Sequence, residues 1–149
     1  MSPFQLRCAN TLDAGQIAQV FIEARTKCLA FLSWEYSLEV MTSVFQRQME
    51  HAEFWIVESD SSVVGFISCV PDEVENLYVL PEFHRMHVGS SLLAKAFEQA
   101  NPEIRLWVFQ ENLPARKFYE RHGFTLEFET DGIHNMEKVP DARYVRMKP

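Results

Sequence analysis

The stretch LYVLPEFHRMHVGSSLL, residues 77–93, joins a short apolar strand to a helix through a turn. The strand stops at Pro81, which cannot continue a central ladder because it has no N–H group to donate. Beyond the turn, apolar residues recur at helical spacing, and they are Val88, Leu92, Leu93, Ala96, Phe97 and Ala100. The pattern predicts a strand ending near residue 80 and a helix from about Arg85 to Ala100.

The turn between them has the composition of an anion-binding site. The first N–H groups of a helix lack intrahelical partners, and the helix dipole adds partial positive charge there. Gly89, Ser90 and Ser91 are small enough for a diphosphate to touch the backbone, and Arg85 adds forked donors. Neither G-x-x-x-x-G-K-[ST] nor a G-x-G-x-x-G after a strand is present. Taken alone, the pattern fits simple helix capping as well as a phosphate site.

Outside this stretch the chain alternates between strand and helix patterns. Asp60-Ser61-Ser62 separates two apolar runs and predicts a hairpin, which a third strand follows closely. Thr11 and Asp13 can cap the first of two early helices. The late order of strand, helix, strand and helix predicts a mixed α/β sheet with a right-handed crossover between parallel strands. The expected strands are 4–9, 54–59, 63–70, 73–80, 104–109, 124–130 and 142–148, and the other expected helices cover 11–24 and 38–49 and start near Asn112.

A second motif, QENLPARKFYERHGF at residues 110–124, has the signals of a short capped helix. Asn112 is a good N-cap and Pro114 is tolerated in a first turn. Gly123 stands where a helix end favours a left-handed residue. One face of this helix carries Ala115, Phe118, Tyr119 and His122.

Together the two motifs resemble the GCN5-related N-acetyltransferase (GNAT) superfamily, which transfers acetyl from acetyl-coenzyme A to an amine. The first matches the family's strand, Pro, turn and x-G-[ST]-x-L-L helix start. The second matches N-x-x-A-x-x-F-Y-x-x-x-G-F through Asn112, Ala115, Phe118, Tyr119, Gly123 and Phe124. The order of elements fits over nearly the whole chain, and the tail NMEKVPDARY resembles tails of small bacterial members.

The resemblance implies one α/β domain over residues 1–149, with a mostly antiparallel sheet of about seven strands flanked by about four helices. It also implies acetyl-CoA as co-substrate and no metal. The backbone of Leu77, Tyr78 and Val79 is expected to contact the pantetheine arm. Asn112 is either a helix cap or a pantetheine contact, and Lys117 is either a phosphate contact or an exposed lysine. The remaining expected cofactor residues are His84, Arg85, Met86, His87, Val88, Gly89, Ser90, Ser91, Ala115 and Phe118.

The turn departs from the family pattern Arg/Gln-x-x-Gly/Ala-x-Gly. In the six residues His84-Arg85-Met86-His87-Val88-Gly89, only the last glycine is kept. If the backbone at His87 is left-handed, a histidine there costs roughly 1–2 kcal/mol. If the turn is right-handed, this cost vanishes, and the side chains of Arg85 and His87 could reach phosphate oxygens. We expect the right-handed turn.

The chemistry requires an acid and a base rather than an enzyme nucleophile. An alkylammonium must lose a proton before it attacks the thioester, and the thiolate must then leave. The resemblance implies Tyr119 as the acid, since a phenol stays protonated at neutral pH; packing alone is the alternative role. Glu75 is the candidate base because burial on its strand would raise its pKa. A neighbouring carboxylate, Asp72 or Glu73, or water remains an alternative.

The composition and charge of the chain limit the classes of partner that it can bind. The chain has 149 residues and a formal net charge of −7. This negative net charge argues against broad nucleic-acid binding, which needs a basic surface. It also favours a cationic amine as the acceptor. Nothing approaches the ~20 apolar residues of a membrane span, and no signal-peptide pattern opens the chain. The three scattered cysteines argue against a disulfide framework, so we expect a cytoplasmic protein without nucleic-acid or membrane partners.

Some features leave two interpretations open. His84 and His87 are three apart but have no defined third ligand, so we expect no metal site. His134 lies either in the acceptor pocket or on a surface loop. The aromatic residues Phe31, Trp34 and Tyr36 either cover the acceptor site or pack in the core.

The leading hypothesis is an acetyl-CoA-dependent N-acetyltransferase acting on a small-molecule or peptide amine. The alternative is a non-catalytic regulatory module that holds acyl-CoA, and a third hypothesis is a partner-binding domain that has lost the cofactor. The oligomeric state stays open, with a homodimer among the alternatives.

Overall fold

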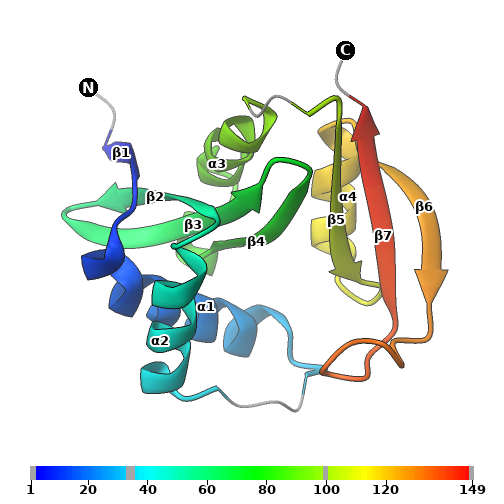
Figure 1. Cartoon of the computed structure of the whole chain (residues 1–149), viewed down its shortest axis with the longest axis horizontal. Helices are drawn as coiled ribbons and strands as arrows, with labels where there is room; N and C mark the ends of the chain where they lie inside the picture. The colour runs from blue at the N-terminus through cyan, green and yellow to red at the C-terminus, as the bar shows by residue number, and fades with distance from the viewer. Residues whose placement is uncertain (1–2, 33–35, 99–100, 148–149) are drawn as a thin grey trace.

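Seven strands form one sheet in the order β1-β2-β3-β4-β5-β7-β6 (Figure 1). The computed structural model describes residues 3–32, 36–98 and 101–147. All neighbouring strands are antiparallel except β4 and β5, which are parallel. The mixed, mostly antiparallel sheet predicted from the sequence is therefore confirmed. The strands are β1 (Phe4–Cys8), β2 (Glu53–Ser59), β3 (Ser62–Val70), β4 (Glu73–Val79), β5 (Glu103–Phe109), β6 (Thr125–Thr130) and β7 (Asp141–Met147).

Four α-helices cover the sheet and build two apolar cores. They are α1 (Ala14–Cys28), α2 (Leu38–Gln48), α3 (Val88–Phe97) and α4 (Leu113–Arg121), with 3-10 turns η1 (Thr11–Asp13) and η2 (Pro81–Phe83). One core joins α1 and α2 to the sheet through Ile17, Phe21, Phe45, Phe54 and Phe66. The other joins α3 and α4 through Ile67, Leu92, Leu93, Leu106 and Tyr144. Figure 1 shows α1 and α3 on opposite faces of the β2–β4 part. Each fully buried large side chain stabilises the fold by about 1.5–3 kcal/mol.

The helix starts differ in detail from the expectation. The side chain of Asn10, rather than Thr11 or Asp13, caps η1 by accepting from Leu12 N–H. The Asp13 carboxylate accepts from the Asn10 N–H and pairs with Arg7, so this carboxylate is buried but satisfied. The helix expected from about Arg85 begins only at Val88. Its expected end at Ala100 lies outside the described residues.

The predicted hairpin between β2 and β3 is confirmed. Asp60 and Ser61 both have positive φ, at 50° and 65°. Two positive φ values in a two-residue loop are typical of a type I′ turn, whose twist matches that of the flanking strands. Ser62, expected in the turn, is the first residue of β3.

Strand β4 contains a β-bulge at Glu75. Ser68 of β3 pairs with Asn76, whereas the next residue, Cys69, pairs with Val74. Glu75 is therefore the extra residue on its strand, and a bulge re-aims the side chain that it carries.

Strands β4 and β5 touch at one end and then part. Their register pair is Glu73 with Arg105, and the Arg105 N–H also donates to the Asp72 carbonyl at 3.0 Å. Figure 1 shows the β2–β4 part opening away from the β5–β7–β6 part beyond this point. The expected parallel pairing is confirmed, and it leaves a space between two neighbouring strands.

The loop between β6 and β7 depends on Gly132, and its substitution provides a test. Gly132 has φ +84°, and an added Cβ would lie 2.2 Å from the Val139 carbonyl oxygen. Gly132→Ala is expected to lower the free energy of unfolding by more than about 1 kcal/mol. Alanine disfavours the positive φ at this position, and its Cβ would clash with the Val139 carbonyl. Chemical denaturation measures the loss, and hydrogen exchange should locate it in residues 131–140.

Gly15→Ala is the matched control. Nothing lies within 4 Å of the Cβ position of Gly15, which is in α1. This change should raise the free energy of unfolding by up to about 1 kcal/mol, as expected for Gly to Ala in a helix. Equal effects of the two changes would contradict the role assigned to Gly132.

Candidate active site

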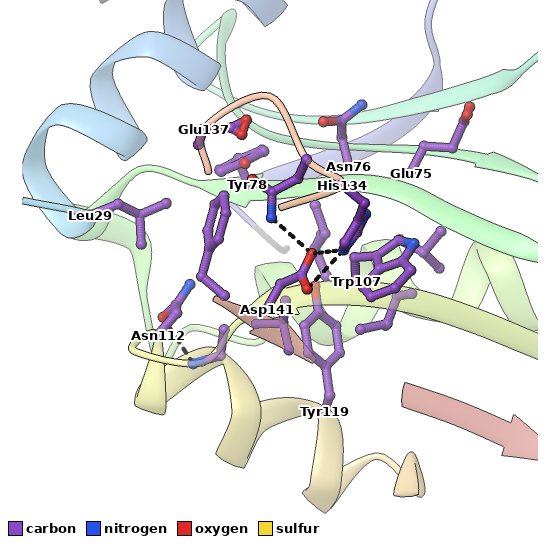
Figure 2. A pocket seen from close by; sticks show the side chains of 17 residues that line it. Leu29, Glu75, Asn76, Tyr78, Trp107, Asn112, Tyr119, His134, Glu137 and Asp141 are labelled. Carbon is purple, nitrogen blue, oxygen red and sulfur yellow. Dashed lines mark hydrogen bonds and ion pairs between the residues drawn. The ribbon is translucent and has the colours of Figure 1, made fainter. Parts of the chain in front are cut away.

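A pocket of about 330 Å³ occupies the space between the diverging strands (Figure 2). Its walls are residues 74–78 of β4, residues 106–109 of β5 and the side of α4. The β6–β7 loop and Leu29, just after α1, complete it. A pocket of this size at the carboxyl end of β4, with several polar groups among mostly apolar walls, is the default place for a reaction site.

Two tyrosines line the pocket, and their hydroxyl groups differ. The Tyr78 hydroxyl accepts a hydrogen bond from Arg25 at 2.9 Å. Tyr119 is buried, with only 8% of its surface exposed, yet its hydroxyl has no hydrogen-bond partner within the described part of the chain. Burial raises the pKa of Tyr119 well above its usual value, so the phenol stays protonated at neutral pH. Figure 2 shows this side chain projecting from α4 into the pocket.

Of the three carboxylates near the start of β4, Glu75 is the one that lines the pocket. Glu73 is bound to Arg143 at 2.7 Å, and Asp72 is exposed in the turn before the strand. Glu75 makes no hydrogen bond or ion pair among the described residues. Partial burial raises its pKa, and the charge of Glu73 raises it further. The bulge therefore presents an unpaired carboxyl group that holds its proton more readily than usual.

The start of α3 leaves three N–H groups outside the helical ladder. The first ladder bond runs from Ser91 N–H to the His87 carbonyl at 3.0 Å, so the N–H groups of Val88, Gly89 and Ser90 precede it. These N–H groups have no intrahelical partner, and anion binding at this helix start stays a prediction. Val79 and Phe118 both approach Gly89, and they connect this turn with the elements that line the pocket.

The expected right-handed turn is wrong. His87 is left-handed, with φ 64° and ψ 12°, and Arg85 also has φ 64°. The chain uses these two residues to turn from η2 into the first turn of α3. The strain that the sequence analysis associated with a missing glycine is therefore present at two positions.

The other expected cofactor residues fall into three groups. His84, Met86 and Lys117 are exposed, and Nε2 of His84 contacts the Val79 carbonyl at 2.8 Å. The hydroxyls of Ser90 and Ser91 contact His122 Nε2 and the His87 carbonyl. Four of the expected cofactor residues line the pocket: Leu77, Tyr78, Asn112 and Ala115.

Two of these residues have a structural role that the sequence left open. Asn112 caps α4 by accepting from Ala115 N–H at 3.3 Å, and it also lines the pocket. An added Cβ on Gly89 would lie 3.3 Å from the Phe118 ring. The contact between α3 and α4 therefore favours glycine there even without a ligand.

The structure adds residues that the sequence analysis missed or left open. His134 lines the pocket, together with Asn135 and Glu137 of the same loop. Asp141 at the start of β7 is buried and hydrogen-bonded to this loop, and the Trp107 ring packs against the His134 ring. His134 is a pocket residue rather than a remote loop residue. Only folding brings these groups together, since they come from β5, the loop and β7.

Arg25 links α1 to the same loop. Its buried guanidinium lies over the rings of Phe21 and Tyr36 and 3.8 Å from Glu137. Phe31 packs edge-on against Phe109 of the pocket wall. Tyr36 is thus in the core beside the pocket, while Trp34 lies outside the described residues.

The sequence model of the Acetyltransferase (GNAT) family matches residues 19–124. The chain belongs to the GNAT family. It is an acetyl-CoA-dependent N-acetyltransferase, with acetyl-CoA as co-substrate.

Relatives and solved structures agree with this assignment. The peptidyl-lysine N-acetyltransferase YiaC of Escherichia coli is 27% identical over 80% of this chain and 82% of its own. The spermidine N(1)-acetyltransferase of Thermoplasma acidophilum is 27% identical over 80% and 76%. Among solved structures, apo YjaB of Escherichia coli has a TM-score of 0.78 at 20% identity and full coverage of both chains. A Thermoplasma acidophilum PaiA N-acetyltransferase in complex with coenzyme A has a TM-score of 0.75 at 22% identity over 99% of both chains. These two structures have the same fold.

The described part of this GNAT domain has neither a metal-ligand cluster nor a membrane-spanning helix. Across residues 3–32, 36–98 and 101–147, no group of three or more His, Cys, Asp or Glu side chains could hold a metal ion. Within the same residues, no helix has the length and apolar character needed to span a bilayer.

The left-handed turn of this GNAT domain can be tested through His87. His87→Gly should raise the free energy of unfolding by up to about 1 kcal/mol, because relief of roughly 1–2 kcal/mol of strain outweighs the added chain entropy of glycine. Chemical denaturation measures this gain.

The control for this prediction is Ala94→Gly, at an exposed position within α3. It should lower the free energy of unfolding by about 1 kcal/mol. A similar loss in His87→Gly would show that the turn at position 87 is not strained.

Proposed function

We propose that this enzyme acetylates a primary amine by direct attack on the thioester, with Tyr119 donating a proton to the departing sulfur. The observation that carries the proposal is the Tyr119 hydroxyl, which lies in the pocket without a protein partner among the described residues. Its raised pKa keeps the proton available until a thiolate develops. Tyr78, whose hydroxyl oxygen already accepts from Arg25, is the poorer candidate.

Acetyl-CoA is proposed to lie across the start of α3 and the pocket. The free N–H groups of Val88, Gly89 and Ser90 would hold the diphosphate, with Arg85 and Lys117 as further cationic contacts. The pantetheine arm would lie along residues 77–79 and the pocket side of α4. The co-substrate supplies an acetyl group on a thiol leaving group.

The acceptor is proposed to be a cationic amine on a small molecule or a peptide. Three carboxylates line the pocket, those of Glu75, Glu137 and Asp141, and Arg25 offsets the second of them. The peptidyl-lysine and spermidine substrates named for the two relatives both carry primary amines. An alkylammonium must lose a proton at a cost of about 4–5 kcal/mol at neutral pH. Glu75 is the carboxylate proposed to hold the ammonium and to take part in this proton removal.

The enzyme is proposed to act as one domain in the cytoplasm. Cys8, Cys28 and Cys69 are all free thiols, and the first two are exposed. Exposed free thiols persist most readily in a reducing compartment.

The strained turn bears on how tightly the enzyme binds its co-substrate. Arg85 and His87 are left-handed without being glycine, which raises the energy of the loop proposed to meet the diphosphate. Calorimetry with coenzyme A measures this affinity.

Tyr119→Phe tests the proposed acid. The change should lower kcat by about 10²–10⁴-fold, because it removes the proton donor for the thiolate. The affinity for coenzyme A should stay within about twofold of wild type. Thiol release from acetyl-CoA with an amine panel gives kcat, and calorimetry gives the affinity.

The matched control is Tyr144→Phe, a buried tyrosine whose hydroxyl donates to Glu120 outside the pocket. Because this hydroxyl also accepts from Arg116 Nε at 2.9 Å, the change removes two hydrogen bonds to charged groups; it should cost about 2 kcal/mol or more of stability and leave kcat unchanged. An unchanged kcat in Tyr119→Phe would remove Tyr119 from the mechanism.

Glu75→Gln should stabilise the fold at neutral pH while it slows the reaction. The pKa of Glu75 is higher in the folded protein than in the unfolded chain. The protonated group therefore favours folding, and this contribution to the free energy of unfolding is lost as the pH rises through the folded-state pKa. A neutral amide avoids this loss, so Tm should rise at pH 7 and differ little at pH 4. Thermal unfolding at the two pH values measures the effect.

Glu73→Gln is the control, since Glu73 is ion-paired with Arg143. Breaking that pair should lower Tm at pH 7. A lower Tm at pH 7 in Glu75→Gln as well would contradict the unpaired state of Glu75.

A further inference from the structure

The Asp141 carboxylate is the centre of a hydrogen-bond network beside the pocket. Asp141 is 3% exposed at the start of β7. It meets Asn135 Nδ2 at 3.1 Å, His134 Nε2 at 3.1 Å and the Thr130 hydroxyl. The carboxylate thus receives three groups from β6 and the following loop, and it is paired although it is buried.

The donors of this network can be assigned from their other bonds. A carboxylate only accepts, so each of its partners must present a hydrogen. Asn135 uses its amide nitrogen there, since its oxygen accepts from Val139 N–H. The Thr130 hydroxyl accepts from Gly132 N–H and directs its own hydrogen to Asp141. His134 must therefore carry a proton on Nε2, and when the ring is neutral a lone pair remains on Nδ1.

The ring of His134 is held in place and open to the pocket. It packs against Trp107 at a centroid distance of 4.7 Å and an interplanar angle of 41°, and Trp107 in turn contacts the Arg143 guanidinium. The side chain is 42% exposed and lines the pocket. Nδ1 makes no hydrogen bond to any residue that the structure describes. Figure 2 shows the ring beyond Asp141 on the side of β4, which carries Glu75.

We propose that His134 is a catalytic proton acceptor for the amine and that Asp141 is the positioning residue that sets its tautomer. This inference rests on the proposed function and names a new destination for the proton. Imidazoles titrate nearer to neutral pH than carboxyl groups, so an imidazole is the better matched base at pH 7. Glu75 keeps the role of holding the ammonium.

The proton balance of the step is complete. The ammonium nitrogen loses two protons while the N–C bond forms and the C–S bond breaks. The first passes to Nδ1 of His134 and leaves through the exposed edge of the ring to solvent. Tyr119 protonates the sulfur, and the second proton from the nitrogen restores the phenol through the solvent in the pocket. One proton is released for each acetyl group transferred.

The groups that face His134 come from every wall of the pocket. Asp141 of β7, Glu75 of β4 and Glu137 of the loop are acidic, and Tyr119 of α4 remains neutral. On β5, Trp107 contacts both the His134 ring and the Arg143 guanidinium. The pH dependence of the rate therefore has to distinguish His134 from Glu75.

His134→Gln is the decisive variant, because a glutamine amide can still donate to Asp141 while the basic nitrogen is lost. With a primary amine that the wild type acetylates, kcat/KM should fall at least tenfold, as removal of a general base typically causes losses of about 10²–10⁴-fold. The acidic limb of the wild-type pH profile of kcat/KM should disappear in this variant. The affinity for coenzyme A should not change. Glu75→Gln should also lower kcat/KM but keep this limb.

A second measurement does not depend on turnover. Nitrogen-15 NMR of the wild-type imidazoles should show His134 as the Nε2–H tautomer, and Asp141→Asn should remove this preference if the variant folds. An Nδ1–H tautomer in the wild type overturns the proposal. It is also overturned if the wild type acetylates an amine and His134→Gln keeps both kcat/KM and the acidic limb. If no amine is acetylated by the wild type, the proposed function fails, and with it this catalytic role.

Discussion

The active site exists because two parallel strands are joined at one end and separate at the other. Glu73 of β4 pairs with Arg105 of β5, and the two strands then follow the twists of different halves of the sheet. A continuous sheet would fill this space with ladder hydrogen bonds, since buried backbone groups must be paired. Instead the pocket opens there, and α3 bridges the two strands along the chain. Both ends of the proposed acetyl-CoA site depend on this connection.

The divergence also distributes the chemistry over separate elements. Tyr119 comes from α4, Glu75 from the bulge in β4 and His134 from the loop before β7. Each side chain is held in place differently. Tyr119 is held by the packing of its helix, Glu75 by the extra residue in its strand and His134 by the buried carboxylate of Asp141. The proposed acid and base lie on separate walls, which leaves room for a thioester and an amine to meet between them, as direct transfer requires.

The two faces of the pocket differ in how firmly they are built. The acceptor side is held by Arg25, which ties α1 to Glu137, and by the network around Asp141. The side proposed to meet the diphosphate is a turn with two left-handed residues that are not glycine. Backbone strain of this kind persists only where the surrounding contacts enforce it, and the packing of Val79 and Phe118 against Gly89 supplies such contacts.

The sequence by itself determined the order and type of nearly all elements, the hairpin at Asp60 and Ser61, the cap at Asn112 and the family. These features depend on residues that are only a few positions apart in the chain. The spacing of apolar residues and the residue types of a turn are local patterns, so the sequence alone reveals them. It also identified Tyr119 and Glu75 as candidates, because the motif and the strand position are local.

Tertiary structure alone decided the handedness at His87, the bulge at Glu75 and the assembly of His134 with Asp141. The first depends on the angle at which α3 must leave η2, and the second on the pairing with β3. The last joins residues that only the pairing of β6 with β7 brings within hydrogen-bond distance. Such features are set by contacts between distant segments, and no pattern within a short stretch of the chain encodes them.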